Sequence, residues 1–258
     1  MKRTLSYTIR PCETRKELAG CVDLQEAIWG YAAHELYPLR LFITLPKIGG
    51  QVLGAFAPDE DLVGFVASMP AWNGRSRYYH SLSLGVLPAH ENQGLGRALK
   101  LRQRKEALKA GIDRIEWTFD PMRAKNAFFN IERLGAIACR YLPDHYGQVQ
   151  SRLQQGLPSD RLVAEWWLKS RRVKRALASK PIRRKNTAVV AEVSIPPEFA
   201  SLVESHPGGA RKLQSAARRE LQTCFARKLA ITGFVIDGSA GRYILERLGR
   251  TRARTGAE

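Results

Sequence analysis

Two glycines, Gly94 and Gly96, lie where a stretch that favours β-structure is followed by a helical one. Tyr78 to Val86 is rich in aromatic and β-favouring residues, and Pro88 ends sheet pairing because proline has no N–H to donate. Glycines in the first turn of a helix let a ligand approach the backbone, where unpaired N–H groups and the helix dipole attract an anion. The spacing therefore predicts a site that holds a phosphate or a pyrophosphate.

Two common phosphate-binding motifs do not fit these glycines. The dinucleotide-binding pattern G-x-G-x-x-G needs a third glycine where Leu99 stands, and the P-loop needs a lysine where Arg97 follows Gly96. The pattern that remains is V-x-P-x-x-x-x-x-G-x-G after a strand, beginning at Val86. A glycine-containing helix cap that binds no ligand is the alternative interpretation.

The run from Val86-Leu87-Pro88 through Gly94-Leu95-Gly96 resembles motif A of the GNAT acyltransferases, in which loop amides bind the pyrophosphate of coenzyme A. The resemblance implies that acetyl-coenzyme A is the co-substrate and that the strand backbone pairs with its pantetheine arm, as an added strand would. Glu91 stands where the family usually has Arg or Gln, which places an acid beside the pyrophosphate, and Arg97 could compensate. The coenzyme-binding residues that the resemblance implies are Leu84, Val86, Glu91, Asn92, Gln93, Gly94, Leu95, Gly96 and Arg97.

The resemblance covers about residues 5–168. The runs WTFDP (117–121) and YLPDHYG (141–147) are similar to those of a group of larger bacterial predicted GNAT acetyltransferases without an assigned substrate. Asn126, in the expected fourth helix, matches a family position that binds the coenzyme through an amide side chain. Asn130 is expected one turn later on the same face.

Acyl transfer from a thioester to an amine needs a base for the amine, and the leaving thiolate can need an acid. The family transfers the group directly, so Cys139 is expected to be a packing residue and not a nucleophile. The usual acid of the family is a tyrosine four residues before the glycine that ends the fourth helix, where this sequence has Ile131. Tyr141 and Tyr146, just downstream, are the candidates for the acid, and a half-buried structural tyrosine is the alternative for each.

Three side chains are candidates for the base. His80 suits proton transfer near neutral pH, and a structural histidine is its alternative. It shares strand parity with the apolar residues Leu82, Leu84 and Val86. Glu116 and Asp120 are expected on one side of the following strand, where the two carboxylates could activate a water or bind an ammonium. A solvent-facing strand edge is the alternative for this pair.

The expected elements follow the GNAT order. Periodicity and turn residues predict an α/β (α+β) chain that ends in a smaller C-terminal β-α-β-β subdomain. The resemblance implies that its first part forms a GNAT-like mixed β-sheet flanked by helices. Thr14 and Glu17 predict a capping box at the first helix. Expected strands are 7–11, 51–56, 62–69, 78–86, 114–119, 136–142 and 161–168, and expected helices are 14–29, 39–48, 93–110 and 123–134. The C-terminal part is expected to form strands 188–196, 230–236 and 242–248 and a basic helix 210–227.

The net charge of +18 is uneven, because residues 169–258 hold 20 Lys and Arg against 7 Asp and Glu, a surplus of 13. Such a segment suggests acidic partners, nucleic acid among them, and a basic solvated surface is the alternative. We expect an acyl-coenzyme A-binding acyltransferase domain over 1–168, a basic linker over 169–186, an α/β subdomain over 187–249 and a basic disordered tail over 250–258.

The four cysteines are scattered, without a C-x-x-C pair, which indicates no metal site and fits a reducing cytosol. No run of 18 apolar residues occurs that could span a membrane, and the first residues carry no apolar signal-peptide segment. We therefore expect a cytoplasmic protein.

Together these features predict a GNAT-type N-acetyltransferase that moves an acetyl or other acyl group from acetyl-coenzyme A to an amine-bearing substrate. One alternative is a catalytically inactive acyl-coenzyme A sensor or scaffold, which Glu91 and Ile131 favour. Another is a basic protein that associates with nucleic acid. The acceptor and the acyl chain stay open, as does the oligomeric state, with a homodimer as one alternative.

Overall fold

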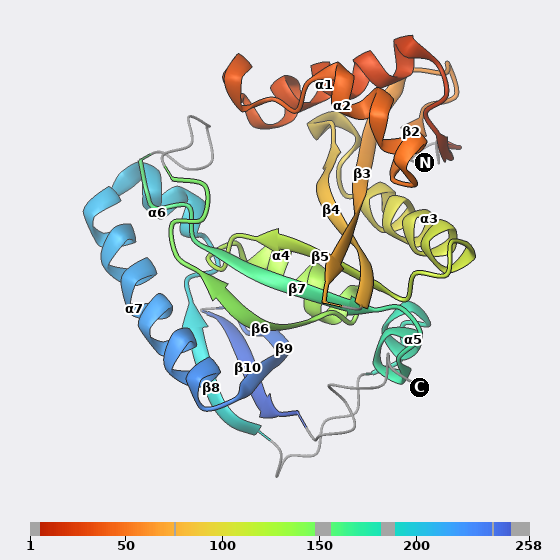
Figure 1. The fold of residues 1–258 in the computed structure, drawn as a ribbon. Helices are drawn as coiled ribbons and strands as arrows, with labels where there is room; N and C mark the ends of the chain where they lie inside the picture. Colours follow the sequence, from red (N-terminus) through yellow and green to blue (C-terminus); the bar gives the residue numbers. More distant parts are fainter. Residues whose placement is uncertain (1–5, 75, 148–155, 182–188, 239, 249–258) are drawn as a thin grey trace. The chain divides into compact units, whose positions relative to one another are not determined.

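The computed structural model describes residues 6–74, 76–147, 156–181, 189–238 and 240–248. Within them, residues up to Ile115 form one compact unit, and those from Glu116 onward form a second. Both units combine strands with helices, which confirms the expected α/β class (Figure 1). The predicted domain boundary after residue 168 lies inside the second unit, and the division into domains stays a prediction.

The first unit is built on four antiparallel strands and three α-helices. The strands are β1 (Thr8–Pro11), β2 (Gln51–Phe56), β3 (Leu62–Asn73) and β4 (Ser76–Val86), and the helices are α1 (Arg15–Trp29), α2 (Leu39–Thr44) and α3 (Leu95–Lys109). The strand order is β1-β2-β3-β4, and the predicted hairpin between β2 and β3 is confirmed. The predicted helix over 39–48 is seen as α2 followed by a 3-10 turn that ends at Ile48.

One strand is longer than the sequence predicts. β3 continues through Pro70, where a turn was expected, because it stays paired with β4 as far as Asn73 and Ser76. The chain reverses only at Gly74, whose φ of 57° lies in the left-handed region that favours glycine. Strand pairing thus outweighs the local turn tendency of Pro70.

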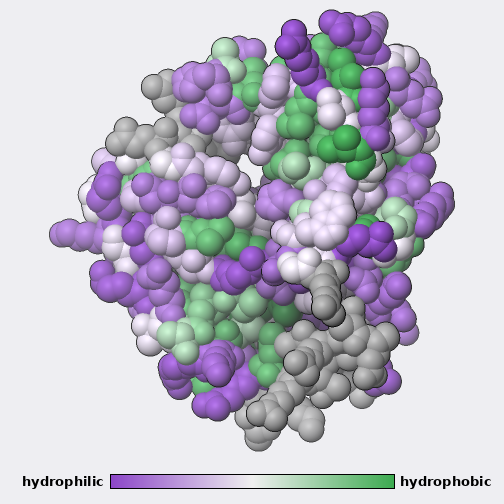
Figure 2. Space-filling model, viewed as in Figure 1, coloured by the Kyte–Doolittle hydropathy of each residue, from purple (hydrophilic) through white to green (hydrophobic). Residues whose placement is uncertain are grey.

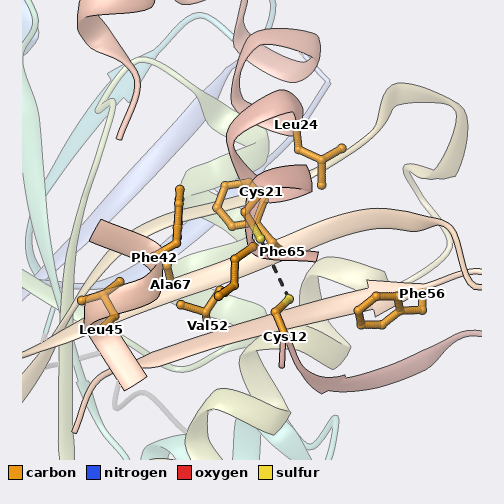
Figure 3. Close-up of a cluster of buried hydrophobic side chains, with 10 residues drawn as sticks. Cys12, Cys21, Leu24, Phe42, Leu45, Val52, Phe56, Phe65 and Ala67 are labelled. Atoms are coloured by element: carbon orange, nitrogen blue, oxygen red, sulfur yellow. Dashed lines mark hydrogen bonds between the residues drawn. The ribbon is translucent and has the colours of Figure 1, made fainter. Parts of the chain in front are cut away.

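Apolar side chains cover both faces of this sheet. One cluster, which includes Cys21, Phe42 and Phe65, packs under α1 and α2 (Figure 3). The other includes Leu95 and Leu99 of α3. Adjacent residues of β2 belong to different clusters, because successive side chains of a strand point to opposite faces.

The second unit begins within β5 (Arg114–Phe119) and contains ten further elements. They are α4 (Ala124–Phe128), a π-helical turn (Phe129–Arg133), β6 (Ile137–Leu142), β7 (Arg161–Trp167), α5 (Arg171–Leu177), β8 (Val189–Ile195), α6 (Phe199–Ser205), α7 (Pro207–Ala226), β9 (Leu229–Ile236) and β10 (Gly241–Arg247). The strand order is β5-β7-β6-β9-β10-β8. β9 and β10 form an antiparallel pair, and β8 pairs with β10.

The predicted C-terminal strands and helix are confirmed, and two helices are added. α6 was not predicted, and α5 lies within the segment expected to be a linker. Ser170 caps α5, and Val173 and Ala176 are buried. Burial of these apolar side chains therefore stabilises a helix within the basic segment that was expected to be a linker. Most of the remaining predicted linker and the predicted tail over 250–258 lie outside the described residues. No helix in the described part of the chain has the length and apolar composition that crossing a membrane requires.

The predicted capping box of α1 is present in full. Thr14 Oγ1 accepts a hydrogen bond from the Glu17 N–H at 3.2 Å, and Glu17 Oε2 accepts from the Thr14 N–H at 3.0 Å. Arg10 Nη2 lies 2.7 Å from Glu17 Oε1. The bond to Arg10, opposed by burial and supported by the backbone N–H groups, lowers the pKa of Glu17 to about 2.

Acid should therefore weaken the first unit in a defined window. The unfolded chain takes up a proton near the ordinary Glu pKa of about 4.3, whereas folded Glu17 resists protonation down to about 2. We expect the free energy of unfolding to fall as the pH drops from about 4.5 toward 2, and Glu17→Gln to reduce this dependence. Denaturant unfolding at several pH values measures it, with Glu26→Gln on the exposed face of α1 as the control. Equal pH dependence in both variants would contradict the assignment.

A polar network lies inside the apolar packing between α3 and the sheet. Lys100 is only 2% exposed, and its Nζ donates to Ser81 Oγ and to Gln103 Oε1, both at 3.0 Å. Gln103 Nε2 also donates to Ser81 Oγ, and Gln51 Nε2 donates to the Gln103 carbonyl. Ser68 Oγ donates to Gln51 Oε1 at 2.9 Å. Burial lowers the pKa of Lys100 to about 7.

This lysine should make stability depend on pH in the direction opposite to Glu17. Between pH 7 and about 10.4, the unfolded chain holds a proton on Lys100 that the folded chain has released. We expect the free energy of unfolding to rise with pH over this range, by up to about 1.4 kcal/mol per pH unit. Lys100→Met should flatten the rise, and Lys105→Met, which is exposed on the same helix, should not. A rise that survives in Lys100→Met would contradict this expectation.

Candidate functional site

The predicted phosphate loop is a left-handed turn that opens directly into α3. Gly94 has a φ of 83°, and no side chain caps the helix that starts at Leu95. A Cβ atom on Gly94 would meet no atom within 4 Å, and one on Gly96 would meet only Leu84 Cδ2, at 3.7 Å. The loop therefore leaves open space in front of the first turn of α3. These features fit an anionic group held by backbone N–H donors.

A side chain outside the motif, that of Tyr7, helps to hold the loop in place. The Tyr7 hydroxyl donates to Gln93 Oε1 and is hydrogen-bonded to His90 Nδ1, both at 2.9 Å. The rings of Tyr7 and His90 also meet edge to face. Sequence reasoning did not identify Tyr7 or His90, because their positions are 83 residues apart and nothing local relates them. Glu91 and Asn92 are exposed, and the φ of 60° at Asn92 adds a second left-handed residue to the loop.

The strand that leads to the loop contains a bulge that changes its facing residues. Ala67 of β3 pairs with Ser83 and Ser68 pairs with Ser81, so Leu82 has no partner of its own. As a result, Leu82 packs with the cluster under α1 and α2, whereas Leu84 packs with the cluster of α3. The prediction that His80 shares one face of the strand with Leu82, Leu84 and Val86 is therefore wrong for two of these residues. Leu84 and Val86 pack on the opposite face from Leu82. A bulge shifts the alternation of side chains by one residue.

The carboxylates predicted on β5 have different environments. Glu116 is buried and bonded to Arg140 Nη2 at 2.6 Å, so it is not on a solvent-facing edge. Asp120 has a side chain that is 22% exposed, accepts from the Met122 N–H and lies 3.6 Å from Arg123 Nε. Desolvation raises the pKa of Asp120 above its ordinary value, against the opposing effect of that hydrogen bond. Of the two, Asp120 has the environment of a proton acceptor.

The two candidate tyrosines are also differently placed. Tyr141 donates its hydroxyl to Asp160 Oδ2 at 2.6 Å, and burial raises its pKa. Tyr146 is 48% exposed, and its hydroxyl is hydrogen-bonded to Thr118 Oγ1 at 2.9 Å. The structure thus brings Thr118 of β5 and Tyr146 together, while Tyr141 is engaged with Asp160.

The remaining predicted residues lie on or near α4. Asn126 is exposed, whereas Asn130 is 5% exposed and accepts a hydrogen bond from Trp117 Nε1, so the surroundings of the two amides differ. Ile131 is fully buried in the π-helical turn. The Cys139 thiol donates to Glu165, and burial raises its pKa to about 12, which leaves little thiolate near neutral pH.

The first unit contains a cavity of about 620 Å³. It is lined by the end of β1, the start of α1, the segment from α2 to the start of β2, and Glu106 of α3. None of the predicted site residues lines it. Among the described residues, no group of three or more His, Cys, Asp or Glu side chains could hold a metal ion.

Comparison with solved structures finds the same fold elsewhere. The ribosomal-protein-S18-alanine N-acetyltransferase of Escherichia coli is 15% identical, with a TM-score of 0.50, over 64% of this chain and 96% of that one. Arabidopsis thaliana NAA60 in complex with acetyl-CoA is 17% identical, with a TM-score of 0.50, over 63% of this chain and 99% of that one. A search of curated proteins finds no match.

Comparison with family models finds a match to the part of the chain that contains the glycine loop. The model of the acetyltransferase (GNAT) family matches residues 16–136. This range contains the bulged strand, the glycine loop and α3, together with β5 and α4. Residues 16–136 of this chain, a little under half of its length, match the acetyltransferase (GNAT) family.

Proposed function

We propose that this chain transfers an acetyl group from acetyl-coenzyme A directly to an amine. The observation that carries the proposal is the open, left-handed start of α3 at Gly94, where no side chain caps the helix. The match to the GNAT family supports it, as does the fold shared with a protein solved in complex with acetyl-CoA. Under this proposal, the residues that bind the coenzyme are those that the resemblance to motif A implies.

Each part of the loop has a defined task in this proposal. When bound, acetyl-coenzyme A supplies the activated thioester. The first-turn N–H groups of α3 hold its pyrophosphate, and the backbone of β4 near Leu84 and Val86 pairs with its pantetheine arm. The bulge at Leu82 leaves backbone groups outside the β3–β4 ladder, where they can bond a ligand instead. The exposed carboxylate of Glu91 weakens coenzyme binding by charge repulsion.

We assign proton transfer to the residues whose surroundings permit it. Asp120 is the preferred base, because its pKa is raised and its carboxylate is partly exposed. Tyr146 is the preferred acid, because its side chain is half-exposed. Its hydroxyl is bonded to the uncharged Thr118 hydroxyl, and such a hydrogen bond is weaker than one to a charged partner. His80 stays a second candidate for the base. Glu116 and Tyr141 are assigned structural roles by their short bonds to charged partners.

The acceptor is an amine whose identity stays open. The E. coli neighbour is an alanine N-acetyltransferase, and at 15% identity this likeness supports only the shared fold. An inactive sensor would bind the coenzyme without turnover. The basic C-terminal part keeps association with nucleic acid as an alternative, and the cytoplasmic location and a homodimer stay predictions.

Coenzyme binding can be tested at Gly94 with a matched pair of variants. Asn and Asp both tolerate the left-handed conformation, so Gly94→Asn keeps the backbone while Gly94→Asp adds a negative charge beside the pyrophosphate. We expect calorimetry to show saturable binding of acetyl-coenzyme A that Gly94→Asp weakens about tenfold more than Gly94→Asn. Glu91→Gln should strengthen binding. Native protein that binds no coenzyme up to millimolar concentration would refute both the enzyme and the sensor.

The base can be tested by the pH dependence of thiol release. Asp120→Asn should lower kcat/KM with an accepted amine by about 10²- to 10⁴-fold. The acid limb of the native profile should lie above the ordinary Asp pKa of about 3.9, because the pKa of Asp120 is raised, and the variant should lose that limb. Asp113→Asn, just before β5, is the control. An unchanged limb in Asp120→Asn would move the assignment to His80.

A further inference from the structure

Three polar side chains on one face of α7 bind a single segment before β7. Arg211 Nη2 donates to the Gly156 carbonyl, and Gln214 Nε2 donates to the Pro158 carbonyl, both at 2.8 Å. Arg218 donates to both oxygens of Asp160, at 2.9 Å from Nε and 2.7 Å from Nη2. The three residues follow the i, i+3, i+7 spacing of one helix face, and their partners advance in steps of two. We call these three side chains of α7 the clamp.

The segment bound by the clamp, residues 156–160, is also hydrogen-bonded to residues 141–147. Asp160 is fully buried and accepts two further hydrogen bonds, from the Tyr141 hydroxyl and from the Asp144 N–H at 2.9 Å. Ser159 Oγ accepts from the Tyr146 N–H at 2.7 Å, and the Ser159 N–H donates to Asp144 Oδ1 at 2.9 Å. Residues 141–147 and 156–160 are therefore interlocked by side chains, beyond the pairing of β6 with β7.

One side of α7 is buried, and it consists of Ala210, Gln214, Ala217, Leu221 and Cys224. Gln214 of the clamp therefore lies in the packed face of the helix, whereas Arg211 is exposed and Arg218 is partly buried. The three clamp residues bind two carbonyl groups and a buried carboxylate of the segment before β7. Other charged residues of α7, such as Lys212 and Arg219, are exposed. Hydrophilic residues make up much of the face of the molecule that Figure 2 shows.

We propose that α7 positions Tyr146, the acid of the proposed reaction, through this clamp, with Arg218 acting through Asp160 on the segment that contains Tyr141 and Tyr146. The inference rests on the proposed acetyl transfer for its catalytic meaning. The family model matches residues 16–136, and α7 lies after them. The proposal therefore assigns a role to a part of the chain that the family model does not cover. Arg218 is a positioning residue, since it contacts the interlocked segments and no reacting group.

The first test measures order and needs no acceptor. Hydrogen exchange in the full-length protein should rise about tenfold over both 141–147 and 156–160 in Arg211→Met and in Gln214→Leu. Arg219→Met, an exposed neighbour on the same helix, should leave both segments unchanged. These two variants keep the buried Asp160–Arg218 pair, so the test does not depend on the folding of Arg218→Met. Unchanged exchange over 141–147 in both variants would overturn the proposal.

The second test separates the clamp from the coenzyme site. In Arg218→Met and Arg218→Lys, the affinity for acetyl-coenzyme A should stay within about twofold of the native value, because the glycine loop is unaltered. The kcat with an accepted amine should fall at least about fivefold in Arg218→Met, with partial recovery in Arg218→Lys, because Tyr146 is no longer held in place. An equal loss of coenzyme affinity, or an equal effect in Arg219→Met, would overturn the proposal. Absence of coenzyme binding in the native protein would instead refute the proposed function, and the exchange experiment would still decide on the clamp.

Discussion

The left-handed backbone at Gly94 is the constraint on which the candidate site depends. It turns the chain from the end of the loop into α3 without a side-chain cap, so the first turn of the helix faces open space. Tyr7 reaches the loop from before β1 and bonds two of its residues, His90 and Gln93. The proposed anion site is thus made of backbone and needs few specific side chains, so the loop can keep its form with Glu91 at a position where the family usually has Arg or Gln.

Burial and bonding partners divide three carboxylates of the second unit into two kinds. Glu116 is buried against Arg140, and Asp160 is buried against Arg218 and Tyr141. Both charges are matched, and removal of either partner would leave a buried charge without compensation. Asp120 has weaker partners and partial exposure, and desolvation raises its pKa. The environment, and not the residue type, selects Asp120 as the candidate for proton transfer.

The sequence predicts most elements well because their signals are local. The capping box of Thr14 and Glu17 lies within four residues, and the predicted bounds of β5 agree with the structure. Predictions that depended on strand parity or helix spacing did less well. The bulge at Leu82 places Leu84 on the other face, and Asn126 and Asn130 differ in exposure although one turn separates them. A pattern of one strand or one helix carries no information about register with its neighbours.

The sequence by itself determined most of the order of elements, the glycine loop and the resemblance to the GNAT family, because each of these depends on short-range spacing. Only the tertiary structure decided which polar groups are buried together. Lys100 meets Ser81 and Gln103 inside the first unit, and Arg218 meets an aspartate 58 residues earlier in the second. Such pairs depend on packing between distant segments, and the desolvation that shifts a pKa, as for Lys100 and Asp120, exists only once those segments have packed.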